Sequence, residues 1–382
     1  MQMELNDNVF LDSDYHSALL GNRITGSIPI EIANISTLKI FVVEANQLSG
    51  NLPAELGNLS QIQRMLLSSN NFTGEIPPTF AKLTSLLDFR IQDNQFSGKI
   101  PDFIQSWTSL RKLVIQGSGL SGPIPSGISL MKNLTDLRIS DLKGSEFSPF
   151  PKLNDLSLHQ LVLRRCNING SLPENLGEMD DLKTLYLTGN LLTGPVPVWT
   201  KKVKNMDISY NNFSIGSNGN EACQDGTLNL FASTLMPNAS GKVSCLRSFA
   251  CPKSSYSLYI NCGGKMVTIN ESLYDGDSDA AGPARFQQSG TRNWGFSNTG
   301  NFMDNDGSDF YTPKNKSKLS MTNAELYMNA RVSPISLTYY GFCLGNGNYT
   351  VNLHFAEIMF TDDQTYKSLG RRLFDIYIQV HN

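Results

Sequence analysis

Residues 38–59, LKIFVVEANQLSGNLPAELGNL, decide the fold of the first half of this 382-residue chain. Apolar and polar side chains alternate at its start, and Asn46 then opens the phrase Asn-x-Leu-x-Gly-x-Leu-Pro. With Phe in place of the first Leu and Ile in place of the second, the phrase returns at Asn70 and Asn94, each 24 residues after the previous copy. A fixed period of about 20 to 50 residues is typical of a solenoid, in which each repeat buries its apolar side against its neighbours. A solenoid offers an extended surface, so the period favours binding over catalysis.

Each position of the repeat has a physical role. The alternating segment predicts a short strand with one buried face, and stacked repeats bring these strands into a parallel sheet. The Asn amide can bond buried backbone groups of adjacent turns, while Gly and Pro set the backbone of the turn that follows. With substitutions the pattern spans roughly residues 14–213: Ser118 and Cys166 fill the Asn position, and residues 141–154 interrupt the period as a loop. We expect Cys166 to be a buried free thiol.

Composition and motifs exclude several classes of function. A net charge of −3 gives no electrostatic case for nucleic acid or for an anionic membrane. No run of 18 apolar residues predicts a membrane-spanning helix, and the acidic start lacks the apolar core of a signal peptide. The four histidines fit no catalytic or metal-binding pattern, and neither a Cys-x-x-Cys pair nor a Gly-x-Ser-x-Gly motif occurs. We therefore expect no catalytic residues, no metal and no cofactor.

Cysteines and glycosylation sequons indicate an oxidising, extracellular compartment. Cys245 and Cys251 are close enough in sequence to bridge, and Cys262 could pair with Cys343 or with a cysteine beyond the expected truncation, so the connectivity stays open. The disulfide candidates are Cys223, Cys245, Cys251, Cys262 and Cys343. Ten Asn-x-Ser/Thr sequons are candidate N-glycosylation sites: Asn34, Asn58, Asn71, Asn133, Asn169, Asn212, Asn238, Asn270, Asn315 and Asn348.

The second half has a different pattern. After about residue 251 the 24-residue period ends, leucine becomes rarer and aromatic residues more frequent. Short alternating stretches separated by Gly, Asp and Asn turns predict an all-β sandwich. The expected strands are 257–261, 265–269, 326–330, 334–340, 349–355 and 374–380. The predicted organisation is a solenoid of about eight repeats over 1–213, a cysteine-containing linker over 214–254 and the sandwich over 255–382.

Two stretches of the chain resemble known families. The first half, with LSGNLPAELGNL and FTGEIPPTFAKL, resembles the plant-type leucine-rich repeat, an α/β solenoid whose parallel sheet lines its concave face. The second half, with YINCGG, NWGFSNTGNF and GRRLFDIYIQV, resembles the malectin domain of plant receptor-like kinases. Together they resemble the ectodomain of a leucine-rich-repeat malectin receptor kinase, and nearly the whole chain takes part.

The same resemblance implies features that the sequence does not contain. Members of that family carry a secretory signal, a cysteine-paired N-terminal cap, a transmembrane helix and a cytoplasmic serine/threonine kinase. No kinase glycine-rich loop, VAIK lysine, HRD or DFG motif occurs here. We therefore expect a chain without kinase activity, with its cap missing and its malectin-like domain truncated at the C-terminus. A fragment, a truncated gene model and a splice product are the three alternatives.

The concave strands supply the first set of candidate binding residues. Side chains between the buried leucines should project from this face and form a mixed-charge band with aromatic residues near one end. An ordinary solvated face is the alternative interpretation. Arg138, Arg164 and Arg165 should lie near one another and could hold a ligand carboxylate. The candidates are Arg64, Asp88, Arg90, Lys112, Asp136, Arg138, Arg164, Arg165, Tyr186 and Tyr210.

The malectin-like half supplies a second set. The animal malectin family binds glucose oligosaccharides on aromatic rings, so the resemblance suggests Trp294, Tyr327, Tyr339 and Tyr340 as carbohydrate contacts. Core positions in the sandwich are the alternative for these aromatics. The acidic runs 275–279 and 304–309 lack the glycine and glutamate positions of a calcium loop, and we interpret both as solvated turns.

These features predict an extracellular recognition region. The expected partners are a peptide or protein ligand, a co-receptor ectodomain, or both, with a cell-wall or glucose-type oligosaccharide at the malectin-like domain. The expected location is the extracellular side of the plasma membrane, or the apoplast if this piece is secreted, and contact with the membrane would need a segment outside this chain. Two alternatives stay open: a secreted leucine-rich-repeat inhibitor of cell-wall hydrolases, and a carbohydrate-active enzyme with a lectin-like module.

Overall fold

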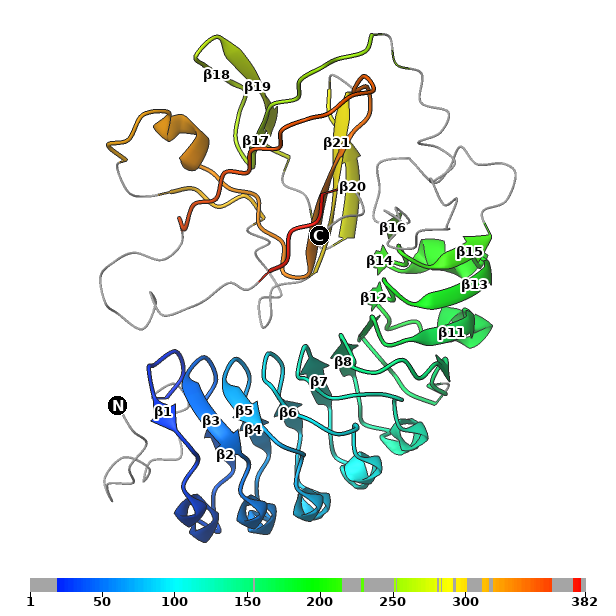
Figure 1. The fold of residues 1–382 in the computed structure, drawn as a ribbon. Coiled ribbons are helices and arrows are strands. Elements are labelled where there is room, and N and C mark those ends of the chain that lie inside the picture. Colours follow the sequence, from blue (N-terminus) through cyan, green and yellow to red (C-terminus); the bar gives the residue numbers. More distant parts are fainter. Residues whose placement is uncertain are drawn as a thin grey trace. The chain divides into compact units, whose positions relative to one another are not determined.

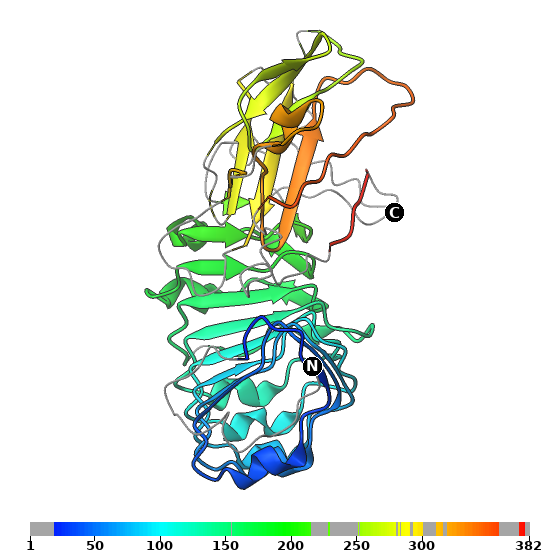
Figure 2. The same ribbon diagram turned by 90° about the vertical axis from the view of Figure 1, so that its left-hand side faces the viewer.

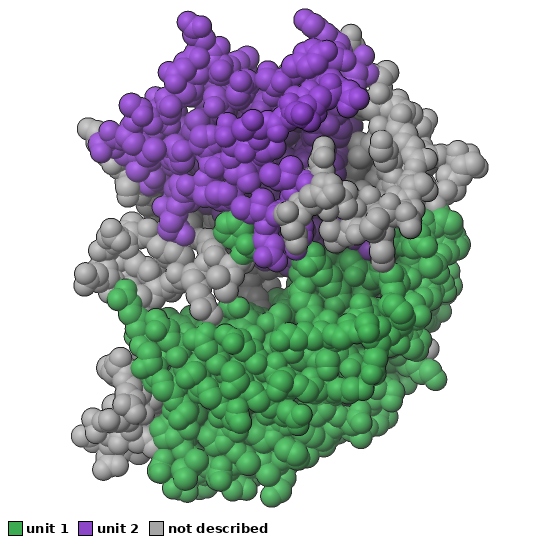
Figure 3. Space-filling model, in the orientation of Figure 1, with its two compact units in different colours: residues 1–204, 211–214, 365–374 green, residues 205–210, 215–364, 375–382 purple. Residues whose placement is uncertain are grey.

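The chain forms two compact units. The structure, a computed structural model, describes residues 19–153, 155–214, 228–229, 251, 253–279, 282, 284–290, 293–300, 311–315, 319–358 and 374–378. The first unit comprises residues 1–204, 211–214 and 365–374, and the second comprises 205–210, 215–364 and 375–382 (Figure 3).

A parallel sheet runs through the first unit. Its strands follow the order β12-β10-β8-β7-β6-β4-β2, and Figure 2 shows parallel strands following one another along the stack. The bounds are β2 Ile40–Val42, β4 Arg64–Leu66, β6 Asp88–Arg90, β7 Lys112–Gln116, β8 Asp136–Ser140, β10 Gln160–Arg164 and β12 Thr184–Tyr186. Met65, Phe89 and Leu113, which follow the first residue of their strands, are at most 1% exposed, because this side of the sheet packs into the interior. The predicted solenoid is confirmed.

One turn of 3-10 helix completes each regular repeat on the outer side of the curved stack, opposite the strands (Figure 1). These helices are η1 Ile30–Asn34, η2 Ala54–Asn58, η3 Pro78–Lys82, η4 Asp102–Ser106, η5 Ser126–Leu130, η6 Glu174–Glu178 and η7 Val198–Lys202. Each starts directly after a proline, whose ring fixes φ at a value that the helix can continue. Among the described residues, no helix has the length and apolar character needed to cross a membrane.

Two smaller parallel sheets lie between the main strands and the helices in sequence. The first has the order β1-β3-β5 and the second the order β15-β13-β11-β9. Their bounds are β1 Thr25–Gly26, β3 Gln47–Asn51, β5 Asn71–Thr73, β9 Ser148–Pro149, β11 Ile168–Ser171, β13 Leu191–Pro195 and β15 Asn212–Ser214.

The repeated asparagine connects adjacent turns, as its amide chemistry predicts. Asn70, 1% exposed, accepts a hydrogen bond at Oδ1 from the Leu48 N–H at 3.0 Å. Its Nδ2 donates to the carbonyl oxygens of Val43, Leu67 and Ser68 at 2.9 to 3.2 Å. One side chain therefore satisfies backbone groups of two consecutive repeats that would otherwise be buried without partners.

In two repeats the buried backbone groups find hydrogen-bond partners although another residue replaces the asparagine. Cys166 is a buried free thiol, as predicted, and its Sγ lies 3.4 Å from Ile139 O and 3.3 Å from Arg164 O, the acceptor positions that an Asn amide would use. Burial raises the pKa of this thiol well above its usual value. At Ser118 the backbone carbonyl accepts from Phe96 N at 2.8 Å. Gly119, at φ +95°, permits this approach, because a Cβ there would lie 2.4 Å from Phe96 O.

The interrupted repeat keeps its strands and changes its outer turn. Between β8 and β10, residues 141–153 and 155–159 contain the short strand β9 but no 3-10 helix. The segment begins with Asp141 in the left-handed region at φ +56°. The predicted loop is therefore confined to the outer part of the repeat, and the sheet continues across it.

Short strands also make up the second unit. β20 (Ala284–Gln288), β21 (Trp294–Thr299) and β22 (Ser336–Gly341) form an antiparallel sheet. β19 (Ser272–Asp277) pairs in parallel with β17 (Ile260–Cys262) and antiparallel with β18 (Val267–Ile269). β14 (Asn205–Asp207) pairs in parallel with β16 (Leu228–Asn229), and η8 (Ala324–Tyr327) is one 3-10 turn.

The expected strands of this unit are confirmed only in part. Stretches 257–261, 265–269 and 334–340 overlap β17, β18 and β22. Stretch 326–330 is wrong, since η8 occupies its start. Stretches 349–355 and 374–378 form no strand, because the described residues offer them no continuous hydrogen-bonding partner, and Leu353 and Phe355 are 50% and 60% exposed. Strands β19, β20 and β21 were not predicted.

A buried ion pair lies at the centre of the second unit. Arg331 donates from Nε to Asp277 Oδ2 at 2.5 Å and from Nη2 to Oδ1 at 2.6 Å, and both side chains are at most 1% exposed. Tyr339 OH and Gly263 N also donate to Asp277 Oδ2. Burial opposes the charge of Arg331, but the Asp277 carboxylate raises its pKa above the ordinary value. The solvated-turn interpretation of 275–279 is therefore wrong at Asp277, while 304–309 lies outside the described residues.

One disulfide joins Cys251 to Cys343. Cys262 is a free thiol, whose pKa is raised by burial. The Cys245–Cys251 and Cys262–Cys343 bridges that the sequence permitted are therefore excluded by this pairing, while Cys223 and Cys245 lie outside the described residues.

Candidate binding surfaces

Strands β2, β4, β6, β7, β8, β10 and β12 are called the inner strands below. They carry two rows of side chains that point away from the interior of the first unit. The register aligns the first residues of successive strands in one row and the third residues in another. Because alternate residues of a strand point to opposite faces, both rows point away from the buried middle residues. The first row reads Arg64, Asp88, Lys112, Asp136, Gln160; the second reads Leu66, Arg90, Val114, Arg138, Val162.

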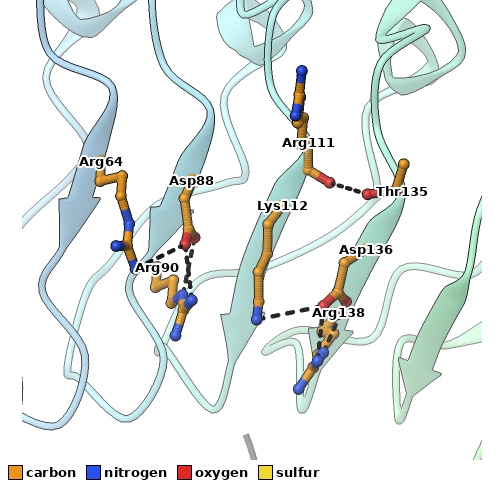
Figure 4. Close-up of polar contacts among 8 residues, drawn as sticks. All are labelled: Arg64, Asp88, Arg90, Arg111, Lys112, Thr135, Asp136 and Arg138. Atoms are coloured by element: carbon orange, nitrogen blue, oxygen red, sulfur yellow. Dashed lines mark hydrogen bonds and ion pairs between the residues drawn. The ribbon is translucent and has the colours of Figure 1, made fainter. Parts of the chain in front are cut away.

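The first cluster of charges joins β4 and β6 (Figure 4). The Arg90 guanidinium donates two hydrogen bonds to the Asp88 carboxylate, from Nε to Oδ1 at 2.9 Å and from Nη2 to Oδ2 at 2.8 Å. Arg64 of the neighbouring strand lies 3.7 Å from the same carboxylate, with 38% of its side chain exposed. One carboxylate therefore has two cations.

The second cluster repeats this arrangement on β7 and β8 (Figure 4). Arg138 donates from Nε and Nη2 to the two oxygens of Asp136 at 2.8 and 2.7 Å, and Lys112 Nζ lies 3.5 Å from Asp136 Oδ2. At the edge of the same strands, Thr135 Oγ1 donates to Arg111 O at 3.2 Å. The second cluster thus reproduces the first two strands further along the sheet.

A third cluster differs in position but keeps the ratio of charges. Arg164 donates from Nη1 to both Asp141 oxygens at 3.1 and 2.8 Å, and Arg165 Nη1 lies 3.8 Å from Asp141 Oδ1. Asp141 and Arg165 occupy equivalent positions in consecutive repeats, both with positive φ. Ser140 Oγ completes the carboxylate's contacts at 2.7 Å.

These three clusters carry a surplus of positive charge. Six cations share three carboxylates, which gives the nine side chains a net charge of +3. Arg90, Lys112 and Arg164 have contacts beyond these three carboxylates, so the count describes the three clusters and not a net charge that is open to a ligand.

The structure brings some of the binding residues predicted for the concave face together and separates or buries others. Arg138, Arg164 and Arg165, expected to hold a ligand carboxylate together, each have an internal carboxylate, and Asp141 was not among the candidates. Tyr186 is 1% exposed. Tyr210 belongs to the second unit. Asp141 lies 24 residues before Arg165, but sequence reasoning missed it because it was assigned to the loop 141–154 that interrupts the period.

A polar cavity of about 270 Å³ opens in the second unit. It is bounded by residues from β19, β20 and β21 and the segments that follow the first two strands. The Gln287 Oε1 atom on its wall is buried and has no hydrogen-bond partner. The lining residues are Gly276, Asp277, Ser278, Asp279, Gln287, Gln288, Ser289, Gly290, Trp294 and Phe296.

The four aromatic candidates of this unit do not form one site. Trp294 lines the cavity, and its Nε1 donates to Asp275 Oδ2 at 3.0 Å. Tyr339 lies behind it, with ring centroids 6.0 Å apart, and bonds Asp277. Tyr340 follows on the opposite face of β22 and stacks on Phe342; burial raises its pKa.

The remaining predictions concern Tyr327, metal ligands and the N-glycosylation sequons. The fourth aromatic residue, Tyr327, pairs through its hydroxyl with His354 Nδ1 at 2.8 Å. Among the described residues, no group of His, Cys, Asp or Glu could hold a metal ion. Asn238 lies outside the described residues, and Asn71 and Asn315 are half-buried. The exposed sequon residues are Asn34, Asn58, Asn133, Asn169, Asn212, Asn270 and Asn348.

Comparisons with known families match both parts of the chain. The model of the malectin domain matches residues 256–382. The model of the leucine-rich repeat matches residues 61–83 and 157–179. The two resemblances stated from the sequence are thereby confirmed, and neither matched family is a kinase catalytic domain.

Curated relatives are receptor-like kinases of Arabidopsis thaliana. One, named a probable leucine-rich repeat receptor-like serine/threonine-protein kinase, is 51% identical over 211 residues, which are 53% of this chain and 20% of the relative. A second of the same description is 50% identical over 189 residues, 46% of this chain and 19% of the relative. The matched part thus spans about one fifth of each relative's length.

Among solved structures, the leucine-rich-repeat ectodomain of the Arabidopsis receptor kinase HAESA, in complex with an extended IDA peptide hormone, is 31% identical. It has a TM-score of 0.46, and the match covers 50% of this chain and 33% of that one.

Proposed function

We propose that this chain, which carries the leucine-rich repeats and the malectin domain of plant receptor-like kinase ectodomains, binds a peptide or protein ligand on the inner strands of its solenoid. A co-receptor ectodomain is a further partner of the same face. The region would act on the extracellular side of the plasma membrane, and a kinase elsewhere in the full-length protein would transmit the signal. We take residues 1–213, 214–254 and 255–382 as the solenoid, the linker and the malectin-like domain.

The observation that supports this proposal is the ordered charge on the inner strands. A merely solvated face would not need two bidentate Arg–Asp pairs at equivalent positions, each with a second cation beside it. Planar guanidinium groups held rigidly in this way lose little entropy when a ligand contacts their remaining donors. The candidate contacts remain Arg64, Asp88, Arg90, Lys112, Asp136, Arg138, Arg164, Arg165, Tyr186 and Tyr210.

Charge reversal at the two outer cations tests this proposal. In the double variant R64E/K112E, Arg90 and Arg138 still hold Asp88 and Asp136, so the fold should persist. We expect the full chain to bind peptides from an unbiased array, and the variant to bind the same peptides at least about tenfold more weakly, since like charges now face the ligand.

The matched control for this experiment is K99E/K132E. Both lysines are more than half exposed and pair with surface carboxylates outside the three clusters. The proposal requires unchanged binding in this control. Equal losses in the two double variants would mean that the inner strands do not form the site.

A second candidate function is carbohydrate binding in the cavity of the malectin domain. A hydroxyl-rich ligand suits this cavity because Gln287 Oε1 has no partner, while Trp294 supplies a ring on the same wall. A cell-wall or glucose-type oligosaccharide is the ligand class, with Tyr327, Tyr339 and Tyr340 as the other aromatic candidates. Trp294 and Gln287 come from adjacent strands of one sheet.

The variant Q287L tests the carbohydrate proposal. Because Gln287 Oε1 has no hydrogen-bond partner, replacing this half-buried side chain by an apolar one of similar size breaks no hydrogen bond of that oxygen and should be nearly neutral for stability. We expect unchanged unfolding but at least about tenfold weaker binding of glucose oligosaccharides in a glycan array, because the acceptor is lost. Q105L, on the exposed outer side of η4, is the matched control. Unchanged glycan binding in Q287L would exclude this residue from the site.

The rival functions make different predictions. An inhibitor of cell-wall hydrolases would bind a hydrolase, and Q287L would have no effect on it. A carbohydrate-active enzyme would convert wall polysaccharide and would lose turnover on replacement of a single carboxylate. Glycan attachment at the ten sequons, with Asn238 and Asn315 among them, remains part of the extracellular proposal.

A further inference from the structure

The interrupted repeat carries an exposed aromatic side chain. Phe147 is 63% exposed, and among the described residues up to 204 no other aromatic side chain is exposed. A regular repeat forms a 3-10 helix directly after its proline, but here Pro151 follows Pro149 by two residues. Helical backbone is disfavoured for a residue that precedes a proline, so Phe150 does not continue into a helix. The repeat therefore presents an apolar segment where its neighbours present a helical turn.

The strand register places Phe147 beside the glycosylation sequon of the next repeat. β9 pairs in parallel with β11, and Pro149 lies opposite Asn169. The preceding pair, Ser148 and Ile168, is 8% and 0% exposed and points inward. Pro149 and Asn169 are exposed, so they point outward. Because alternate residues of a strand point to opposite sides, Phe147 points outward with Pro149.

A further apolar side chain lies on the other side of the sequon. β13 follows β11 in the sheet (Figure 1), and the half-buried Leu191 lies opposite Asn169. Pro149 and Leu191 therefore flank Asn169 on one face. Neighbouring strands lie about 4.8 Å apart and residues two apart along a strand about 6.6 Å, which places the Cα atoms of Phe147 and Asn169 about 8 Å from each other.

We propose that Phe147 and Pro149 form a platform for the first sugar of an N-glycan at Asn169. This inference rests on the proposed extracellular function, in which the sequons carry glycans, and names what one of these glycans contacts. The first sugar, an N-acetylglucosamine, has ring faces made of C–H groups and an acetyl group that ends in a methyl. These groups bury apolar surface against an aromatic ring while the sugar hydroxyls stay in water.

The position of the sequon favours the chain's own glycan over a partner protein as the group that covers Phe147. A glycan at Asn169 is bulky and begins on the same face as the ring, so a protein could not cover the ring without displacing the glycan. The glycan is also tethered close by, which makes its effective concentration at the ring far higher than that of a free ligand. This side of the interrupted repeat is therefore covered by sugar.

A second exposed sequon of the same sheet supplies an internal control. Asn212 of β15 lies opposite Thr193, a polar residue, and β15 is at the opposite end of the sheet from β9. A glycan at Asn212 therefore has no contact with Phe147.

Site-specific release of the glycan tests the proposal with the full chain secreted from mammalian cells. A peptide N-glycosidase is added under native conditions, and mass spectrometry follows the conversion of Asn169 and Asn212 to aspartate. We expect F147S to speed release at Asn169 at least about fivefold, because a sugar packed on the ring is withheld from the enzyme, and to leave release at Asn212 unchanged. F147Y keeps the ring and should keep the slow rate.

The matched control variant is V198S. Val198, in η7, is 84% exposed, so this variant also removes an exposed apolar side chain but should change neither rate. An equal rate of release at Asn169 in F147S and in the unmodified sequence would overturn the platform, and so would the absence of a glycan from Asn169. Glycans at other sequons would then leave the extracellular proposal standing, whereas glycans at none would count against that proposal too.

Thermal unfolding gives an independent test. N169Q prevents glycosylation at this site and should unfold about 2–4 °C below the unmodified sequence, because the ring loses its cover. In the N169Q background F147S should cause no further loss, since the partner of the ring is already absent. Additive losses of the two substitutions would contradict the contact.

Discussion

The variant R331M should destabilise the second unit by about 3–5 kcal/mol. The guanidinium has no exposed surface, and it supplies two hydrogen bonds to the Asp277 carboxylate and others to the carbonyls of Asp277 and Asp279. Methionine fills much of the same volume over the Phe296 ring but leaves a buried carboxylate without its cation. The loss should appear as faster hydrogen exchange at the β21 amides.

A matched replacement separates this effect from loss of charge alone. Arg285 pairs with Asp279 at 3.6 Å and is more than one-third exposed, so R285M should cost less than about 1 kcal/mol. The double variant D277L/R331M should recover part of the loss, because it removes the uncompensated charge. A cost below 1 kcal/mol in R331M would show that the pair does not hold this unit together.

The variant N70A should destabilise the solenoid by about 2–6 kcal/mol. It removes the acceptor of Leu48 N and the donor to Val43 O, and both backbone groups are buried, at about 1–3 kcal/mol each. Thermal unfolding followed by circular dichroism measures the loss. N58A, at an exposed position of η2, should change stability by less than about 0.5 kcal/mol.

In another repeat of the chain, Cys166 occupies the position that Asn70 has here. Cys166 places a thiol against the two carbonyls that an Asn amide would reach. N70C should therefore lose less stability than N70A, because the thiol still contacts Val43 O. Equal losses in the two variants would contradict the role assigned to the amide hydrogens.

The solenoid could be predicted from sequence because its rules are local and repeated. Asn70 and its equivalents recur every 24 residues, so strands, turns and the buried face follow from one period. Even the substitutions at Ser118 and Cys166 obey the same requirement to satisfy buried backbone groups. The 3-10 helices follow from the prolines that precede them.

The second unit was predicted less completely because its decisive contacts are distant in sequence. Asp277 and Arg331 are 54 residues apart, and nothing in DGDSD or NARVSP indicates that they pair. The acidic composition of the first segment instead suggested a turn. Strand β19 was missed for the same reason, since charged residues on a strand become stable only with such a partner.

The candidate binding surface could be predicted from sequence less completely than the solenoid but more completely than the second unit. The period predicted that Arg64, Asp88, Lys112 and Asp136 share a face, and the register agrees. Which cation pairs with which carboxylate depends on side-chain rotamers, so the repetition of the first cluster on β7 and β8 and the third cluster at Asp141 emerged only from the structure.

The measurement that tests the central claim most directly is the titration of the tightest array peptide into the full chain, R64E/K112E and K99E/K132E. Binding on the inner strands predicts that only R64E/K112E loses affinity, at least about tenfold, while all three proteins unfold at the same temperature. Unchanged affinity in R64E/K112E would contradict the assignment of the inner strands as the ligand-binding face.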